Sequence, residues 1–384
     1  MTPRPWSVGT VCLLAALASL AVAGPHEARA QDALPPDAAT RLGVEVGPVV
    51  QSFRFSDSES TGMESLTLVT FPVTAGVEIH QRFRAELRGA WAHGILGWEN
   101  GESADLSGPT DTEVRFGVEL IPDAVTVTAI GLLPTGQDAH DPEQVTLAGA
   151  VAADLLPFEI SHWAAGGGGG ASVSAVHSFG STGLGLDAGY RRSGEFQPTD
   201  EPAARYRPGD AVYVTGVVDH AVTPTGRLSL RLDARYFGDD ELDGENLYRT
   251  GDRLAGTASY AFATGARSSA LAYAGYRHRS SGAFLVDLDE RTAQGLLVAG
   301  AALRTPAAGG TLTPRLDARL LRRDDGMDQG YTVGVGADGE WEVGRIVLQP
   351  TARVHVGSVD LRADEESGFY GMDLALRVRP GGAP

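Results

Sequence analysis

The stretch Arg231-Leu232-Asp233-Ala234-Arg235 returns later in the chain as Arg315-Leu316-Asp317-Ala318-Arg319, and earlier, in a looser form, as Arg84-Ala85-Glu86-Leu87-Arg88. Each copy places arginine, a carboxylate and arginine at positions i, i+2 and i+4, with small or aliphatic residues between them. Residues two apart in a β-strand share a face, so one face carries alternating charges and the other is apolar. Nearly the whole chain repeats this alternation, which favours a barrel with lipid outside and water inside.

The first thirty residues have the pattern of an export signal. Arg4 supplies a positive start, residues 8–23 form an apolar run, and Ala28-Arg29-Ala30 fits a small-x-small cleavage site. We therefore predict a signal peptide over 1–30 and a short N-terminal lead over 31–40. No later stretch approaches the roughly eighteen consecutive apolar residues that a membrane-spanning helix needs, so any membrane crossing is expected to use strands.

The composition agrees with a sheet in which every second residue meets water. Of the 384 residues, 42% are hydrophobic and 50 are glycine, and the formal net charge is -18. This acidic balance argues against a nucleic-acid partner. The single cysteine, Cys12, lies within the predicted signal, so the mature chain is expected to contain neither a disulfide nor a thiolate site.

A period-two test divides residues 41–380 into amphipathic segments separated by polar or glycine- and proline-rich breaks. Each segment core is near the roughly nine to eleven residues with which a tilted strand crosses a bilayer. The predicted fold class is therefore all-β: a closed antiparallel transmembrane β-barrel of about sixteen strands, with about fourteen as the alternative count. The segments are 41–55, 64–80, 82–98, 111–121, 124–134, 158–179, 183–195, 210–220, 227–238, 252–263, 268–284, 292–304, 310–323, 330–342, 345–359 and 369–379.

The breaks between these segments alternate in character. Tight turns are predicted at His80-Gln81, Pro122-Asp123, Ser181-Thr182 and Val343-Gly344, and longer acidic connections lie between them. Outer-membrane barrels have short periplasmic turns and long extracellular loops, which is the layout expected here. The long connections are 99–110, 196–209, 239–251, 285–291, 324–329 and 360–368.

The same alternation determines which side chains should line the interior. A charge facing lipid costs roughly 2–4 kcal/mol near the midplane and little in a wet lumen, so the charged faces should point inward. The predicted pore-lining residues are Arg84, Glu86, Arg88, Arg231, Asp233, Arg235, Arg315, Asp317, Arg319, Arg353 and Arg377. Aromatic residues near segment ends are expected to form interfacial girdles. They are Phe53, Trp98, Tyr190, Tyr236, Phe262, Tyr276, Trp341 and Tyr370.

The connection over residues 135–157 is unlike the others. Its second half has helical composition, and Pro142 can open a helix that Pro157 would stop. This segment is predicted either to fold into the barrel or to lie as a surface loop over the rim.

The export signal, the amphipathic segments, the alternating turns and loops and the arginine–carboxylate ladders together resemble a Gram-negative outer-membrane porin. The resemblance covers the mature chain in pattern, although the chain ends on Arg377–Pro384 rather than on an aromatic residue. In general porins the loop at the position of 135–157 folds inward and forms the constriction. The resemblance implies that its acidic side consists of Asp138, Asp141, Glu143 and Asp154, facing the arginine-rich strands across the barrel.

Three functions remain open on these grounds. The first is an outer-membrane channel for passive diffusion of small hydrophilic solutes or ions through an Arg/Asp-lined pore. The second is a more selective transporter for hydrophobic or aromatic compounds, and the third is a barrel with a structural, non-transporting role. An enzyme is not expected, because the sequence shows neither a nucleophile–base set nor a Gly-x-Ser-x-Gly elbow.

The sequence also predicts which cofactors, partners and location to expect. The histidines are too scattered for metal-ligand spacing, so neither a metal nor a cofactor is expected. The expected partners are outer-membrane lipid, the barrel-assembly machinery and small solutes, in the outer membrane of a Gram-negative bacterium. Monomer and trimer are both compatible with the sequence.

Overall fold

The computed structural model describes residues 40–56, 62–79, 82–200, 203–284, 290–323, 328–362 and 365–381. The predicted signal peptide, all but the last residue of the predicted lead, and the predicted His80-Gln81 turn lie outside the described residues.

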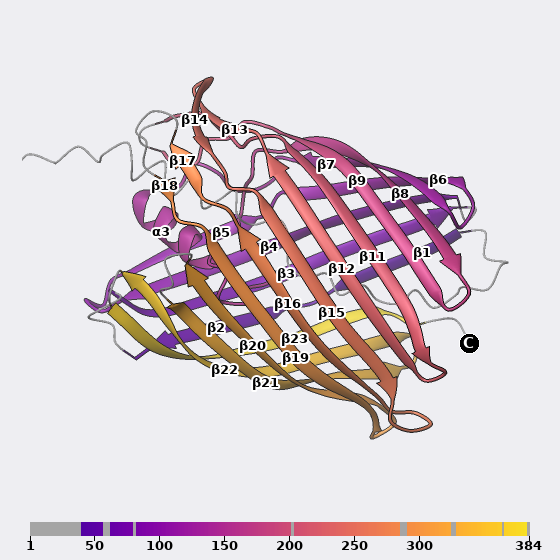
Figure 1. Ribbon diagram of the computed structural model, residues 1–384. Coiled ribbons are helices and arrows are strands. Elements are labelled where there is room, and N and C mark those ends of the chain that lie inside the picture. The colour runs from indigo at the N-terminus through magenta and orange to yellow at the C-terminus, as the bar shows by residue number, and fades with distance from the viewer. Residues whose placement is uncertain are drawn as a thin grey trace, which may run out of the picture.

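The described chain forms a closed antiparallel β-barrel of sixteen strands (Figure 1). Strands that follow one another in sequence pair along the wall, and the last strand pairs with the first in the registers Val46↔Val378 and Phe53↔Gly371. Closure removes the edge whose unpaired N–H and C=O groups could not be satisfied in hydrocarbon. The predicted fold class is confirmed, with sixteen strands rather than fourteen.

The elements of the wall have the following bounds. They are β1 (Thr40–Val46), β2 (Val49–Phe55), β3 (Met63–Ile79), β4 (Phe83–Trp98), β5 (Ser103–Pro109), β6 (Thr112–Ile121), β7 (Val125–Leu133), β8 (Gly168–Phe179), β9 (Thr182–Ser193), β11 (Ala211–Thr223), β12 (Gly226–Phe237), β15 (Arg253–Ala263), β16 (Ser269–Arg279), β19 (Gln294–Ala307), β20 (Gly310–Arg323), β21 (Asp328–Val343), β22 (Ile346–Arg362) and β23 (Glu365–Pro380).

Two of the sixteen strands are interrupted, so each counts as two elements. The first breaks at Gly47-Pro48 into β1 and β2, and Pro48 O accepts a hydrogen bond from Leu376 N at 3.0 Å. A Cβ at Gly47 would overlap the Leu376 carbonyl oxygen, so this approach of the backbones requires glycine. The fourth strand breaks at Thr110 and Asp111 into β5 and β6, both of which pair with β4.

Several predicted boundaries were wrong. The sixth segment was expected to begin at residue 158, but β8 begins at Gly168, because the residues before it pack inside the barrel. The predicted connection 99–110 contains β5, which continues the wall, and the predicted connection 239–251 contains a hairpin of two strands. A charged sequence that resembles a loop can therefore still form a strand, because the hydrogen bonds of the ladder join backbone groups and do not depend on the side chains.

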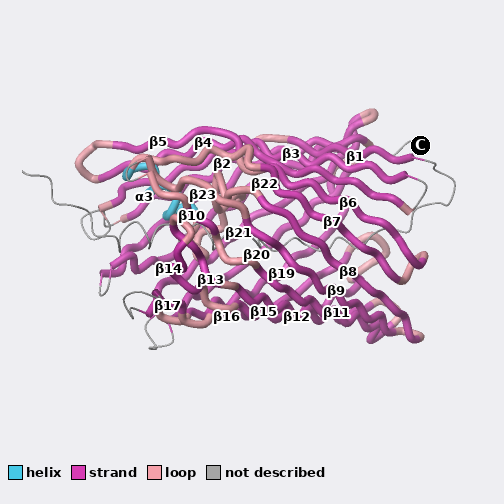
Figure 2. The backbone as a smooth tube through the Cα atoms, turned by 90° about the horizontal axis from the view of Figure 1, so that it is seen from above, coloured by secondary structure: helices cyan, strands magenta, loops and turns pink. Residues whose placement is uncertain are grey.

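The hairpin belongs to a second sheet outside the wall. This sheet contains β10 (Tyr206–Arg207), β13 (Asp239–Leu242), β14 (Glu245–Arg249), β17 (Gly282–Phe284) and β18 (Glu290–Arg291). At its centre the buried Asp240 carboxylate accepts hydrogen bonds from Tyr206 Oη at 2.6 Å and Thr250 Oγ1 at 3.1 Å. In Figures 1 and 2 the second sheet and the helix α3 (Pro142–Val151) lie at the same end of the barrel.

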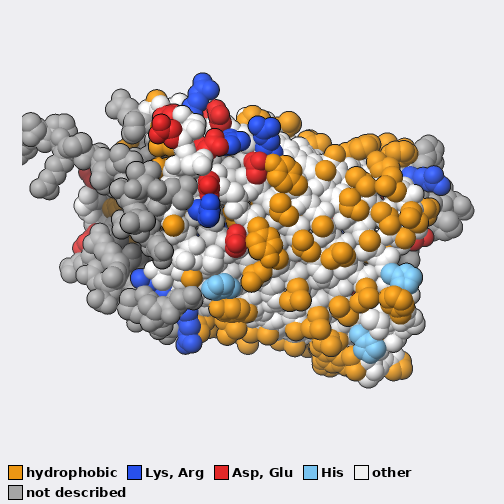
Figure 3. Space-filling view, turned by 45° about the horizontal axis from the view of Figure 1, so that its top comes forward, with side chains coloured by type: hydrophobic (Ala, Val, Ile, Leu, Met, Phe, Trp, Pro, Cys, Tyr) orange, Lys and Arg blue, Asp and Glu red, His pale blue; other side chains and the backbone are white. Residues whose placement is uncertain are grey.

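The outside of the wall is apolar. Alternate residues on each strand are exposed aliphatic or aromatic side chains, such as Leu230, Leu232 and Tyr236 on β12. Figure 3 shows hydrophobic side chains spread over the wall, with most charged side chains of this face gathered toward the end that carries β13 and β14. A closed barrel with this exterior satisfies its backbone internally and presents apolar atoms to lipid, which makes it a transmembrane barrel.

The aromatic residues divide between the two faces. Tyr190, Tyr236, Tyr276 and Tyr370 are exposed on the outside, as expected of interfacial girdles. Phe53 and Trp98 were expected in these girdles as well, but Phe53 is fully buried and Trp98 packs against the same internal cluster. Both lie on the inward face of their strands, where an internal loop covers them.

Candidate functional site

The predicted ion ladder on β4 lies on the face opposite the exposed Leu87. Arg84 Nη2 is 3.1 Å from Glu86 Oε2, and Arg88 Nε contacts Oε1 of the same carboxylate. The Glu86 side chain is 8% exposed. The i, i+2, i+4 spacing thus brings two guanidinium groups onto one buried carboxylate inside the barrel.

The second ladder lies on the inward face of β12. Arg231 donates to Asp233 through Nε at 2.8 Å and Nη2 at 2.7 Å, and Thr215 Oγ1 on β11 donates to the same carboxylate at 2.7 Å. Arg235 follows two residues later and lies close enough to Arg191 of β9 for the two positive charges to repel each other.

The third ladder joins three strands. Arg315 on β20 and Arg353 on β22 both contact Asp338 on β21, with Arg353 Nη2 at 3.3 Å from Oδ1. Asp317 and Arg319 continue along the inward face of β20, opposite the exposed Leu316. Asp338 was absent from the predicted site, although the alternation of its strand could have identified it.

The connection between β7 and β8 crosses the interior of the barrel. On one side, Arg319 Nη1 donates to Asp154 O and Thr332 Oγ1 donates to Leu155 O, both at 3.4 Å. On another side, its main chain reaches Gln51 on β2, whose Nε2 donates to Pro157 O and whose Oε1 accepts from Glu159 N, both at 2.6 Å. These contacts connect the loop to strands on the far side of the wall from β7 and β8.

An ion pair adds to this attachment. Arg377 Nη2 on β23 lies 2.9 Å from Glu159 Oε1 and donates to Oε2 at 3.0 Å. Of the predicted wall residues, Arg319 therefore contacts the loop through a hydrogen bond and Arg377 through an ion pair. Glu159 was assigned to a strand in the sequence analysis, so its role was missed.

Asp111 holds the two ends of the loop together. Its Oδ1 accepts from Gly136 N at 2.8 Å, and its Oδ2 accepts from Ala165 N at 2.6 Å. Thr135 Oγ1 donates to Thr110 O at 2.9 Å beside it. The break between β5 and β6 therefore positions a carboxylate at the base of the loop, where backbone N–H groups would otherwise have no partner.

The helix α3 begins with a capping box. Asp141 Oδ1 accepts from Gln144 N at 2.8 Å, Gln144 Oε1 accepts from Asp141 N at 3.3 Å, and Pro142 occupies the first turn. The helix ends at Val151, six residues before the expected stop at Pro157. The extended residues that follow it present main-chain oxygens to Arg319 and Thr332 instead.

An apolar cluster fills the space between the loop and the inner wall of β2 to β5. A Cβ at Gly94 on β4 would lie 3.1 Å from Trp163 and 3.3 Å from Leu147, so the loop lies flush against this strand. Phe158 packs edge-on against Phe53, with ring centroids 5.2 Å apart. The fully buried members include Phe53, Leu66, Leu68, Leu96, Leu106, Leu147, Leu155 and Trp163. Each such side chain contributes roughly 1.5–3 kcal/mol on burial, so the cluster holds the loop firmly.

The four predicted acidic residues of the loop do not form one cluster of ion pairs. Asp141 is the helix cap, Glu143 is exposed in the first turn, and Asp138 is exposed before the helix. Asp154 contacts Arg319 through its main-chain oxygen.

His162 in the loop is partly buried. Burial lowers its pKa from 6.5 to about 4, with Asp111 opposing the shift and Arg191 adding to it. The imidazole is therefore neutral near pH 7. Ser161 Oγ lies 3.2 Å from its Nδ1.

A buried histidine–aspartate pair lies on the inward face of β22 and β23. His355 Nε2 is 2.9 Å from Asp373 Oδ2, and His355 also contacts the Phe53 ring at a centroid distance of 5.8 Å. Neither residue was among the predicted pore-lining residues. The register between the two strands places Arg353 directly opposite Asp373. The contact between His355 and Asp373 is therefore diagonal across the two strands.

Within the described ranges, no group of three or more His, Cys, Asp or Glu side chains is arranged to hold a metal ion. In the same residues, no helix is long and apolar enough to cross a membrane.

The closed sixteen-stranded barrel, its apolar exterior and its charged interior define a transmembrane β-barrel with a porin-like fold. Neither a family model nor a curated protein matches the chain.

Solved structures with a similar fold are outer-membrane proteins of low sequence identity. An outer membrane channel from Pseudomonas putida F1 is 15% identical, with 78% of this chain and 99% of that chain covered and a TM-score of 0.40. An anion-selective porin from Comamonas acidovorans is 13% identical, with 88% and 99% covered and a TM-score of 0.41. OprB of Pseudomonas putida is 8% identical, with 88% and 92% covered and a TM-score of 0.45.

Proposed function

We propose that this barrel is an outer-membrane channel through which small hydrophilic solutes or ions diffuse passively, without an enzymatic step. The observation that carries the proposal is the loop attached across the interior, from Asp111 on the wall beside it to Gln51, Thr332 and Arg377 beyond it. A barrel of sixteen strands is too wide for side chains alone to fill, so a loop held across it leaves a narrowed passage.

The charges of the inward face support a polar solute. The ladders on β4, β12 and β20 place guanidinium groups and carboxylates along one continuous face, where water can solvate them. Arginine outnumbers carboxylate among the predicted lining residues, and Arg191 and Arg235 lie close together. We infer a preference for anions, because fixed charge at a constriction sets selectivity.

The apolar cluster supports a second candidate, a transporter for hydrophobic or aromatic compounds. Such a protein needs an apolar surface along its path, and Phe158 and Leu156 of the loop lie among apolar residues of the wall. Against it, the members of the cluster pack against one another and so leave that surface covered.

Single-channel recording of the refolded barrel in planar bilayers tests these candidates. The proposed channel gives steady ohmic steps, with a reversal potential in a salt gradient that favours anions. Ionic current that aromatic acids block at low concentration would favour the selective transporter. A barrel that inserts and stays silent contradicts both and supports a structural role.

A further inference from the structure

Two polar side chains on the inner wall face the lumen without a partner. Within the part of the chain that the structure describes, Arg191 on β9 and Tyr213 on β11 take part in no hydrogen bond or ion pair. The residues next to them, Tyr190 and Val212, are exposed on the outside of the barrel, so Arg191 and Tyr213 point inward. Their donor groups are therefore open to a solute inside the barrel.

The strand registers place these two groups side by side. Arg191 lies opposite Ala211, and Tyr213 lies opposite Gly189, which is two residues before Arg191 on the inward face of β9. On its other side, Tyr213 lies opposite Arg235 of β12. Since Ala211 ends at its Cβ, the side chain opposite Arg191 leaves the guanidinium open toward the lumen.

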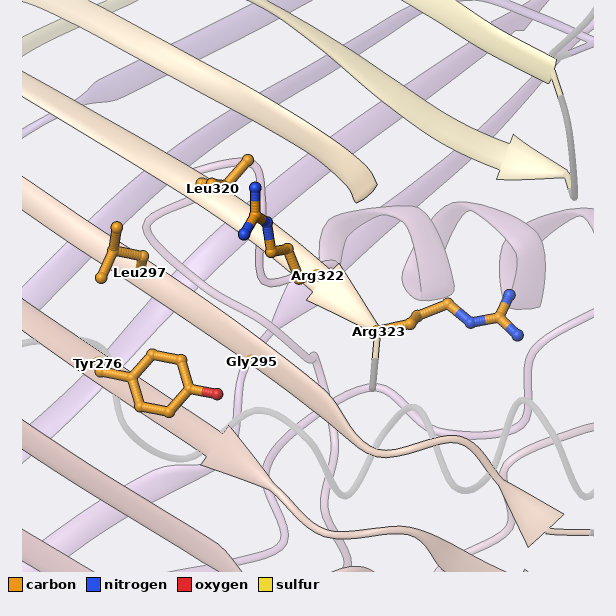
Figure 4. Close-up of a pocket in the computed structure, with 6 residues that line it drawn as sticks. All are labelled: Tyr276, Gly295, Leu297, Leu320, Arg322 and Arg323. Atoms are coloured by element: carbon orange, nitrogen blue, oxygen red, sulfur yellow. The ribbon is translucent and has the colours of Figure 1, made fainter. Parts of the chain in front are cut away.

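A glycine orients the phenol. A Cβ at Gly189 would overlap the ring and the hydroxyl of Tyr213, so the phenol lies across β9, the strand that carries Arg191. Figure 4 shows the same arrangement on the outer wall, where the Tyr276 hydroxyl lies over Gly295 beside a cavity of about 320 Å³. On the inner wall the arrangement brings a hydroxyl next to a guanidinium, so the two can donate to one ligand.

The carboxylates within electrostatic reach of Arg191 are bound to other groups. Glu113 accepts a hydrogen bond from Arg115 Nε at 2.6 Å, and the two oxygens of Asp111 accept backbone N–H groups at the ends of the loop. The loop comes near Arg191 at His162, whose imidazole is neutral near pH 7. Arg191 therefore keeps its N–H donors for a ligand.

We propose that Arg191 and Tyr213 form a binding site for the carboxylate of a small organic solute. The planar fork of the guanidinium donates two parallel hydrogen bonds to the two carboxylate oxygens, and the phenol donates a third. Arg235 adds attraction without being needed as a donor. The proposal rests on the proposed function, because a solute reaches this site through a water-filled lumen. It adds saturable binding of carboxylates to passive diffusion.

Saturation-transfer NMR of the barrel in lipid nanodiscs, titrated with propionate, tests this site. Propionamide has the same shape without the charge and should bind about tenfold more weakly. We expect Arg191→Gln to raise the dissociation constant of propionate about tenfold, because it removes the charge and the fork together. Arg191→Lys keeps the charge but lacks the fork and should raise it about fivefold. Tyr213→Phe should raise it about threefold, because it removes one hydrogen bond and retains the ring.

Arg227→Gln is the matched control. Arg227 is exposed and lies on the same face of β12 as Arg235, eight residues away, which is about 26 Å along the strand. This variant removes the same charge from the lumen far from the site. The dissociation constant of propionate should therefore change less than about twofold.

Equal binding of propionate and propionamide to the unaltered barrel would overturn the proposal, and this comparison decides the matter if a variant fails to fold. Equal losses in Arg191→Gln and Arg227→Gln would also overturn it, because binding would then reflect the overall charge of the lumen. Conductance in bilayers without propionate binding would refute the site and keep the channel. Propionate binding by a barrel that stays silent in bilayers would refute the channel and keep the site.

Discussion

Leu232 and Ser229 lie on opposite faces of β12, three residues apart. Leu232 is 69% exposed on the outside, and Ser229 shares the inward face with Arg231 and Asp233. We expect Leu232→Arg to impair assembly strongly, because a guanidinium facing lipid costs roughly 2–4 kcal/mol near the midplane. Ser229→Arg introduces the same side chain into water and should fold normally. The folded fraction after refolding into lipid vesicles measures the difference, and equal yields would contradict the assignment of the two faces.

His162 gives the loop a dependence on pH. Its pKa in the folded protein is about 4, against 6.5 in an exposed histidine, so the released loop binds the proton more tightly. The loop is therefore most stable above about pH 6.5 and loses stability as the pH falls toward about 4. Hydrogen exchange of residues 134–167 between these pH values should show increasing exposure on acidification.

The matched variant for this experiment is His162→Gln, which keeps a polar side chain but does not titrate. Its loop should show the same exchange at pH 4 as at pH 7, apart from the intrinsic rate. A pH dependence that persists in His162→Gln would show that His162 is not its cause.

At the scale of elements, the loop with α3 is the part that narrows the proposed passage. We expect deletion of residues 138–156 to raise single-channel conductance, because the deleted segment contains the contacts to Arg319 and Thr332. The barrel wall keeps all its strands in this variant, so the gel shift on heating should be retained. Unchanged conductance in a folded deletion protein would place the loop outside the ion path.

Gln51→Leu provides a milder variant of the same experiment. It removes both hydrogen bonds to the loop at Pro157 and Glu159 while the chain keeps its length. Each unsatisfied buried group costs roughly 1–3 kcal/mol, so the loop should leave its position more often. Larger fluctuations of the open-channel current are the expected result, with a smaller change in mean conductance than for the deletion.

At the scale of the whole molecule, barrel closure predicts heat-modifiable migration. The folded barrel has paired backbone throughout the wall and no edge at which unfolding can start, so it should resist detergent until boiled. Unboiled and boiled samples should migrate differently on a gel, and circular dichroism should be dominated by β structure. A helical spectrum, or identical migration of the two samples, would contradict the closed barrel.

The charge balance of the interior predicts the ion preference of the whole channel. We expect Arg88→Ala combined with Arg319→Ala to shift the preference toward cations, most clearly at low salt, where the Debye length reaches roughly 30 Å at 0.01 M. Reversal potentials in a salt gradient measure the shift. Arg54→Ala, which removes a charge from the outer surface, should leave the reversal potential where it was.

Much of this fold could be read from side-chain alternation. Period-two patterns in Leu228–Tyr236 or Ile346–Val356 report which face meets lipid, because that face must be apolar whatever the neighbouring strand is. The bounds of the wall strands agree closely with these patterns in most cases. The second sheet was missed because β13 and β14 are short and rich in acidic residues, so their sequences resemble loops.

The contacts inside the barrel join residues that are far apart in the sequence, so no local sequence pattern could predict them. Glu159 and Arg377, or Gln51 and Pro157, are far apart in sequence and meet only because the barrel closes and the loop crosses it. Phe53 illustrates the limit. Its place near a segment end predicted an interfacial girdle, but the side chain faces inward and packs against Phe158 of the loop. The alternation of the sequence by itself determined the barrel, its two faces and the inward arginines, because each follows from local backbone geometry. Closure decided which carboxylates those arginines contact and which arginines hold the loop, because strand register and loop path arise only when the whole ladder forms.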